Sequence, residues 1–233
     1  MNEQSLSDRM KSYENDPALA MDSPESVMVL RLDGKAFHTY TRGSDKPFDE
    51  HLGRSMRMAM LAVSYEIQGF VMGYTQSDEV SILCARSRPE AEMYFGAKTQ
   101  KAVSVVASMY THYFNHYIQE PNWIKVPAFF DCRAFELPSF VEADNYLLWR
   151  QFDCQTNAIN SVASYHFTPK QLHSKSQAER IQMISDIGDD VDNYNPLFYN
   201  GATCIGNSRI LNVQHGQLFS KVMSSQPEFM VDA

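Results

Sequence analysis

The first 140 residues alternate between the short hydrophobic period of strands and the longer period of helices. Apolar runs predict strands at 26–32, 70–75, 80–85 and 128–135. Apolar residues three or four positions apart predict amphipathic helices at 49–69 and 90–117. Residues 76–79 have the composition of a hairpin turn. The resulting order of strand, helix, strand, strand, helix, strand predicts an α+β fold of the ferredoxin-like, or split βαβ, kind.

The remainder of the chain is predicted to be mainly helical. Helices are expected at 143–164, 169–175 and 176–187, with Thr168 and either Ser174 or Ser176 as N-caps. A small hairpin near 197–212 and a polar tail complete the pattern. Because no stretch rich in Pro, Gly or Ser separates these elements from the first unit, we expect a single domain, 1–233. It would comprise a core at about 25–140 and a packed extension at about 141–215.

The predicted topology brings two acidic turns together. In a split βαβ unit the third strand lies between the first and second and is antiparallel to both. Asp33 at the end of the first strand is therefore expected beside Asp78 and Glu79 of the hairpin turn. Carboxylates that converge in this way repel one another unless a cation joins them, and hard oxygen ligands suit Mg²⁺. The carbonyl of Gly34 is a natural further ligand, and a pair of such ions supports phosphoryl transfer.

The alternative interpretation is that these acids are ordinary turn residues without a metal, since Asp, Gly and Ser are common in turns. Phosphate binding would also need bases. Lys46 lies in the loop after Asp33, while Lys98 and Lys101 are spaced to share one face of the predicted long helix. Such a helical pair is equally typical of a solvated surface.

Overall charge bears on the kind of partner. The chain has 20 Lys and Arg against 28 Asp and Glu, a net charge of −8, which at face value disfavours nucleic acid. The excess is local, however, because 1–30 holds six acids and two bases and 186–192 holds four acids and no base. The simplest interpretation of both stretches is a solvated tail and a solvated loop. We therefore expect RNA to avoid these two stretches and to bind elsewhere in a salt-sensitive way.

The remaining composition indicates no zinc site and no membrane segment. The four cysteines, Cys84, Cys132, Cys154 and Cys204, form no CxxC pair. The polar N-terminus does not resemble a signal peptide, and no apolar run approaches the length of a membrane span. These features predict a cytoplasmic protein.

Four sequence strings resemble the tRNA-histidine guanylyltransferase family, which includes guanylyltransferase-like 3′–5′ polymerases. The strings are RLDGKAFHTYTRGSDKPFDE, GYTQSDEVSIL, FDCRAF and LWRQFDCQTNAIN, and the resemblance runs from about 25 to 205. It implies a polymerase/cyclase palm fold. It also implies two Mg²⁺ ions, ATP, GTP or other nucleoside triphosphates as substrates, and the 5′ end of tRNA or another RNA as partner. Family members are commonly tetramers, so a homo-oligomer is expected.

The resemblance also implies residue roles. Asp33, the Gly34 carbonyl and Asp78 correspond to metal ligands, and Glu79 to an adjacent catalytic acid. The nucleotide-contacting set is Gly34, Lys35, Ala36, Phe37, His38, Lys46, Ser77, Lys98 and Lys101. A further set is interpreted as RNA-orienting or structural: Arg31, Arg133, Trp149, Arg150, Gln151, Asp153, Asn157 and Lys175.

The implied reaction adds nucleotides to an RNA 5′ end. The end is activated by ATP or GTP, and the 3′-hydroxyl of an incoming nucleoside triphosphate then attacks it. Strict histidine-tRNA enzymes read DCHINN where this chain has Gln155, Thr156 and Ala158 around Asn157. That departure favours template-dependent repair over addition of one guanosine. A palm-fold nucleotide cyclase and a non-catalytic RNA-binding domain are two further hypotheses for this fold.

Overall fold

A six-stranded antiparallel sheet forms the centre of the molecule. The computed structural model describes residues 4–15, 19–88, 90–118, 122–207 and 209–225. The strands lie in the order β4-β1-β3-β2-β5-β6. Their bounds are β1 Val27–Gly34, β2 Phe70–Gln76, β3 Glu79–Cys84, β4 Phe130–Leu137, β5 Ala202–Ile205 and β6 Arg209–Leu211. The predicted ferredoxin-like arrangement is confirmed, since β3 lies between β1 and β2 and pairs antiparallel with both.

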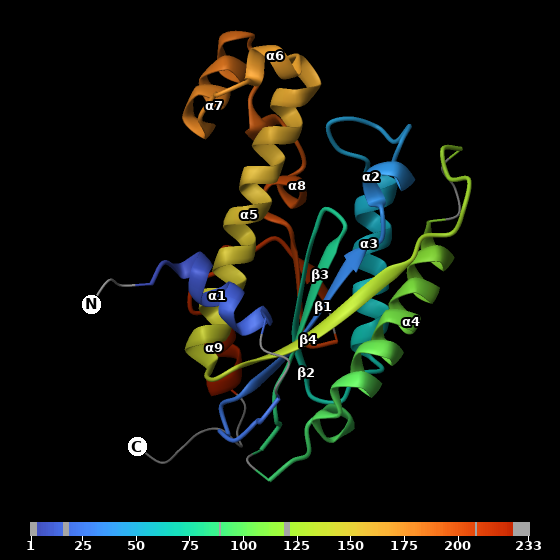
Figure 1. Cartoon of the computed structure of the whole chain (residues 1–233), viewed down its shortest axis with the longest axis vertical. Helices are drawn as coiled ribbons and strands as arrows, with labels where there is room; N and C mark the ends of the chain where they lie inside the picture. Colours follow the sequence, from blue (N-terminus) through green and yellow to red (C-terminus); the bar gives the residue numbers. More distant parts are fainter. Residues whose placement is uncertain (1–3, 16–18, 89, 119–121, 208, 226–233) are drawn as a thin grey trace.

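Helices cover both faces of this sheet (Figure 1). On one face α3, Glu50–Ser64, packs beside α4, Thr99–Tyr117. On the other face lie α5, Phe140–His166, with α1, Leu6–Asn15, and α9, Leu218–Ser224. Alternate residues of β1 enter the two hydrophobic cores, so that Leu30 packs toward α3 and α4 while Val29 packs toward α5. The sheet is thus buried on both faces along most of its length.

The far end of α5 carries a small helical lobe. It contains α6, Pro169–Leu172, and α7, Gln177–Asp186, followed by the short η2, Val191–Asn193, and α8, Pro196–Asn200. Capping boxes at Thr168 and Ser176 begin α6 and α7, which confirms Thr168 and selects Ser176 over Ser174. In Figure 1 the lobe stands above the sheet, facing the short helix α2, Phe37–Tyr40. No helix in the described ranges has the length and apolarity needed to cross a bilayer.

The predicted long helix at 90–117 is wrong at its start. Residues 94–97 form the short turn η1, Tyr94–Ala97, and α4 begins only at Thr99. Phe95, Gly96 and Ala97 all have positive φ values, between 52° and 59°, which a right-handed helix does not permit. The predicted polar tail is also wrong in part, because α9 buries Phe219 and Met223 against α5. Residues 226–233 of that tail lie outside the described residues.

The two acidic stretches are not simply solvated. In the first stretch, α1 buries Met10 completely, and Arg9 pairs with Glu142 of α5 at 2.9 Å. Residues 1–3 and 16–18 of this stretch lie outside the described residues. In the second, Asp189 accepts hydrogen bonds from His166 and Tyr194, each at 2.7 Å, which attach the loop to the end of α5. These contacts hold the pKa of Asp189 well below its usual range, Tyr194 contributing most.

Candidate active site

The hairpin turn and the end of β1 meet as the topology predicts. The Gly34 N–H donates to the backbone carbonyl of Asp78 at 3.1 Å, and Asp33 lies opposite Glu79 in the β1–β3 register. Ser77 takes the left-handed conformation, with φ of 50°, and its hydroxyl donates to Asp78 Oδ1 at 3.1 Å. Burial raises the pKa of Asp78, and the nearby charge of Asp33 raises it further. The two carboxylates are therefore neighbours whose charges oppose each other.

The turn after β1 is held in place by an aromatic anchor. Phe37 is only 4% exposed and packs against Phe130, with ring centroids 5.0 Å apart, and against Phe114. A Cβ atom on Gly34 would lie 2.2 Å from the Phe37 ring, so only glycine fits there. Lys35, Ala36 and His38 are exposed around this anchor. Phe37 therefore has a structural part in addition to any contact with a ligand.

Gly34→Ala is expected to destabilise the fold by roughly 1–3 kcal/mol, the usual cost of overpacking a filled site. The measurement is urea unfolding followed by circular dichroism. Adding Phe37→Leu removes the clashing ring, so the double variant should lose less than the sum of the two single changes. Strict additivity of the two changes would show that the Gly34–Phe37 contact is not the cause.

Glu79 lies opposite Asp33 as expected, but arginines pair with both of its carboxylate oxygens, so they are not free to join Asp33 and Asp78 around a cation. Arg31 of β1 contacts Glu79 Oε2, and the Arg150 Nε of α5 lies 2.9 Å from Glu79 Oε1. Arg31 also pairs with Glu14 of α1, and Arg150 with Asp153. Burial raises the pKa of Glu79, whereas the charges of Arg150 and Arg31 oppose that rise. Glu79 is thus the centre of an ion-pair chain that joins α1, β1, β3 and α5.

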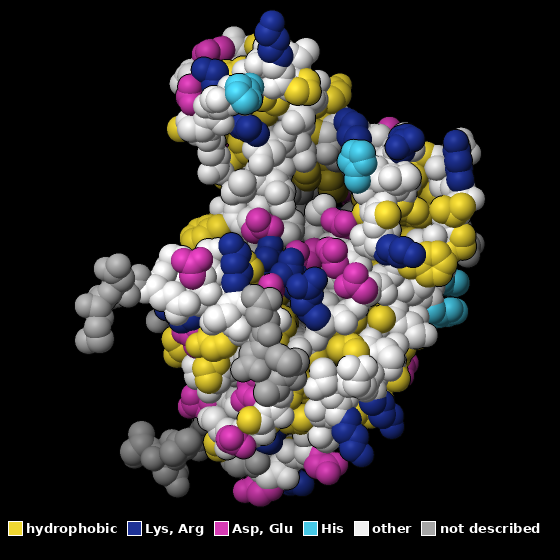
Figure 2. All heavy atoms as spheres, in the orientation of Figure 1, with side chains coloured by type: hydrophobic (Ala, Val, Ile, Leu, Met, Phe, Trp, Pro, Cys, Tyr) yellow, Lys and Arg dark blue, Asp and Glu magenta, His cyan; other side chains and the backbone are white. Residues whose placement is uncertain are grey.

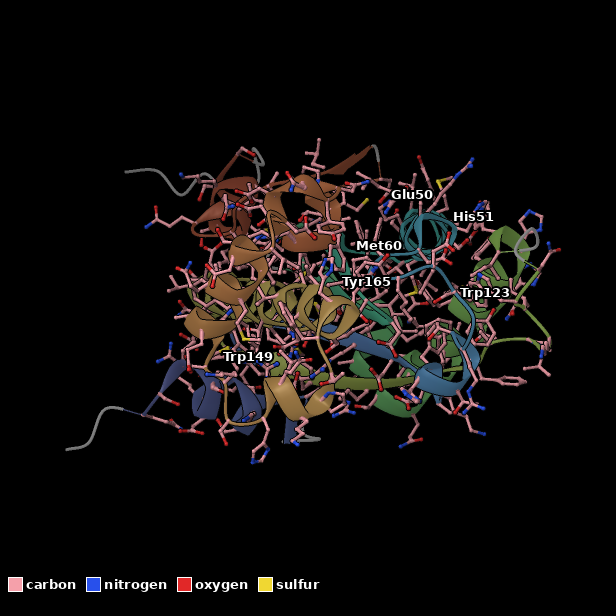
Figure 3. All side chains as sticks on the ribbon, turned by 90° about the horizontal axis from the view of Figure 1, so that it is seen from above. Glu50, His51, Met60, Trp123, Trp149 and Tyr165 are labelled. Atoms are coloured by element: carbon pink, nitrogen blue, oxygen red, sulfur yellow. The ribbon has the colours of Figure 1, made fainter. Side chains whose placement is uncertain are left out.

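Several residues of the set interpreted as RNA-orienting or structural contact other parts of the protein. Arg150 is buried and stacks over the ring of Trp149 at 4.3 Å. Seen from above, Trp149 lies on the α5 side of the sheet, away from Trp123 and the start of α3 (Figure 3). Gln151 is 1% exposed, and its amide binds backbone groups of Asn200, Val213 and His215. Asp153 accepts from Gln76 Nε2 at 3.2 Å and from Asn157 Nδ2 at 3.3 Å.

An acidic residue missed by the sequence analysis lies beside Asp33. Asp131 is directly opposite Asp33 in the β1–β4 register, so both side chains lie on the same face of the sheet. Asp131 stands within the FDCRAF string, but only the strand register reveals its partner. Figure 2 shows Asp and Glu side chains gathered next to Lys and Arg side chains below the hollow that separates the upper lobe from the body.

The donor set at this edge fits a hard cation. Asp33, Asp78 and the Gly34 carbonyl offer oxygen ligands only, and the charges of the two carboxylates oppose each other. Within the described ranges no three His, Cys, Asp or Glu residues group closely enough to hold an ion by themselves. Magnesium sites that use one or two carboxylates together with substrate phosphates have this composition. The arrangement thus fits an ion that is bound together with a phosphorylated ligand.

A cavity of about 370 Å³ opens next to the hairpin turn. Its lining comes from α2, α3 and the loop between them, the end of β2, the turn, α5, α8 and the start of β5. Asp78, Ser77, Lys46 and His38 contribute polar groups, and Phe48 and Phe198 form an aromatic wall, with ring centroids 5.1 Å apart. Asn157 of α5 and the anchor Phe37 also line it. The volume lies within the range of small-molecule sites, which is about 300–1,000 Å³.

Three of the predicted basic residues lie away from this cavity. Lys98 precedes α4 instead of lying within it, and the Lys101 ammonium sits 4.4 Å from the centre of the Phe95 ring. Both follow Gly96, which lines a cleft with Met21 and Arg86. That cleft lies beyond the opposite end of β1, which is roughly 20 Å from Asp33 at about 3.4 Å per strand residue. Lys175, in the upper lobe, pairs with Glu179 at 2.9 Å.

Comparison with known proteins places these features in a family. A family model described as tRNAHis guanylyltransferase matches residues 7–138. The tRNA(His) guanylyltransferase of Schizosaccharomyces pombe is 33% identical over 162 residues, which cover 67% of this chain and 60% of that protein. The chain thus spans about 60% of the length of this relative.

Solved structures show the same likeness. A bacterial tRNA(His) guanylyltransferase-like protein in complex with ATP superposes with a TM-score of 0.74 at 34% identity, covering 86% of both chains. A bacterial protein of the same description in complex with GTP has a TM-score of 0.64 at 33% identity, covering 87% of this chain and 84% of its own. The palm fold, the motifs at the Asp33 edge and these matches together show that the chain belongs to the tRNAHis guanylyltransferase family.

Proposed function

We propose that this protein is a nucleotidyltransferase that adds nucleotides to the 5′ end of tRNA or tRNA-like RNA, in the 3′–5′ direction. The observation that carries the proposal is the junction of Asp33 and Gly34 with Asp78, which itself lines a nucleotide-sized cavity. The bacterial relatives bound to ATP and to GTP support nucleoside triphosphates as substrates. The absence of the DCHINN histidine supports template-dependent repair over strict addition of one guanosine.

The cavity accounts for nucleotide binding in this proposal. Phe48 and Phe198 offer an apolar wall for the base. Lys46 at the cavity rim and the exposed Lys35 and His38 supply positive charge and hydrogen-bond donors for the triphosphate. The Ser77 hydroxyl orients the Asp78 carboxylate. These residues bind the nucleotide or orient Asp78, and the reaction itself takes place at Asp33 and Asp78.

Asp33, Asp78 and the Gly34 carbonyl would hold two magnesium ions, whose chemistry is to acidify the attacking 3′-hydroxyl and to neutralise charge on the phosphates. Glu79 acts through Arg31 and Arg150, and it keeps the hairpin strand in register with β1. Asp78 is therefore presented at a fixed place relative to Asp33. The exposed Arg133, Asn157 and Lys175 are available to contact RNA. A homo-oligomer, tetrameric as in the family, belongs to the same proposal and is checked by analytical ultracentrifugation.

The test is an addition assay on 5′-truncated tRNA transcripts with Mg²⁺ and each nucleoside triphosphate in turn. We expect extension only when the incoming base pairs with the opposite strand of the acceptor stem. Addition of a single guanosine to histidine tRNA alone would identify a strict guanylyltransferase instead. A cyclic product from GTP and Mg²⁺ without RNA would identify a cyclase, and RNA binding without any product would identify a non-catalytic domain.

A further inference from the structure

Phe129 is an exposed aromatic residue at the start of β4, immediately beside the candidate site. It is 58% exposed, whereas the next residue, Phe130, is 6% exposed and packs in the core. The Lys35 N–H donates to the Phe129 carbonyl at 2.8 Å, which extends the β1–β4 ladder by one step. Because successive strand residues point to opposite faces, Phe129 lies on the face that carries Asp131 and Asp33.

Phe129 and the nucleotide cavity lie on opposite sides of Asp33. The cavity is lined by the end of β2 and the hairpin turn, and Phe129 is not among its lining residues. The strand order β4-β1-β3-β2 puts β1 between the two. At about 4.8 Å per strand, β4 and β2 are roughly 14 Å apart. A group held at Phe129 and a nucleotide in the cavity would therefore approach Asp33 from different directions.

Three bases lie near this aromatic residue, alongside the acids Asp131 and Asp33 of the same face. Lys35, Lys125 and Arg133 are all exposed near the start of β4 or along it. Arg31, opposite Arg133, is already paired with two glutamates, while Arg133 has no ion-pair partner among the described residues. An exposed aromatic ring next to uncompensated bases is the combination that binds single-stranded nucleic acid, by stacking on a base and pairing with phosphates.

We propose that Phe129 stacks on the 5′-terminal base of the RNA, while the incoming nucleotide occupies the cavity on the other side of Asp33. This inference rests on the proposed function and deepens it by naming the contact that orients the RNA end. We assign the stacked base to the RNA and not to the incoming nucleotide, because the cavity already accounts for the incoming nucleotide. Phe129 is a binding and positioning residue for the RNA end.

A binding experiment tests this independently of catalysis. The probe is a tRNA acceptor-stem RNA with 2-aminopurine at its 5′ terminus, titrated with the full chain. Stacking on an aromatic ring should quench the fluorescence of the terminal 2-aminopurine. We expect Phe129→Ala to weaken binding about tenfold, within the range for loss of one stacked base, and to abolish the quenching. Phe129→Trp should restore both, and thermal melting should show that each variant is folded.

Tyr65 provides the matched control, because it is 63% exposed but lies at the end of α3, shortly before β2 begins and therefore at the end of β2 opposite the hairpin turn. Tyr65→Ala should bind and quench like the wild type. Quenching by Phe129→Ala equal to that of the wild type would overturn the inference. A raised KM of Phe129→Ala for the incoming nucleotide, with unchanged RNA binding, would also overturn it. That result would mean that Phe129 contacts the base of the incoming nucleotide and not that of the RNA. Failure of the wild type to bind any RNA would instead refute the proposed function.

Discussion

Replacing Asp33 or Asp78 by asparagine is expected to reduce the rate of nucleotide addition by at least about a thousandfold, while the protein stays folded. Asparagine keeps the size of the side chain but removes the charge that would hold a divalent cation. Loss of the ion's stabilisation, several kcal/mol in phosphoryl transfer, corresponds to a rate loss of this order. The measurement is single-turnover addition to a 5′-truncated tRNA at saturating nucleotide.

The melting temperature of the same variants provides a second test of the prediction. Burial and the charge of Asp33 both raise the pKa of Asp78, so its ionised form opposes folding when no cation is bound. The ion-free Asp78→Asn protein should therefore melt at the same temperature as the wild type or above it. Asp192→Asn, which changes an exposed acid in η2, is the control and should leave both activity and melting unchanged. Full activity in Asp78→Asn would remove Asp78 from the site.

Replacing Glu79 by alanine is expected to have the largest effect on stability. The change leaves Arg31 and Arg150 facing each other across a space from which water is largely excluded. Removing one partner of a buried ion pair typically costs about 3–5 kcal/mol. We expect a loss at the lower end of this range, because Arg31 keeps Glu14 as a partner and Arg150 keeps Asp153. Urea unfolding followed by fluorescence reports this change, and Trp149, which stacks on Arg150, is one of the two tryptophans.

A surface ion pair provides the comparison. Lys175 and Glu179 are 2.9 Å apart on exposed side chains, and Lys175→Ala should cost at most about 1 kcal/mol. A double-mutant cycle with Glu79→Gln and Arg150→Met measures the coupling within the buried chain directly. Equal losses for Glu79→Ala and Lys175→Ala would mean that the buried chain of charges adds nothing to stability. Activity losses in Glu79→Ala are then interpreted only after correction for the unfolded fraction.

The order of elements and the hairpin turn at 76–79 were predictable from the sequence because both depend on neighbours along the chain. Apolar periodicity distinguishes β1, β2 and β3 from α3 and α5, and the capping residues Thr168 and Ser176 define where α6 and α7 begin. The topology then places Asp33 next to Asp78, which the Gly34–Asp78 hydrogen bond confirms. Where the backbone leaves the ordinary helical region, as at Phe95 and Ala97, the same periodic signal runs on through the break and misplaces the start of α4.

Residue pattern alone was therefore enough for the split βαβ order, the acidic turn pair and the family to which the chain belongs. The part that each charged residue takes depends instead on the folded arrangement. That arrangement assigns Glu79 to two arginines, puts Asp131 beside Asp33 and leaves Lys98 and Lys101 beyond the opposite end of β1. The physical reason is that a charge pairs with whichever group packing brings within a few ångströms. That choice depends on strand register and helix placement, which residue types and spacing do not specify.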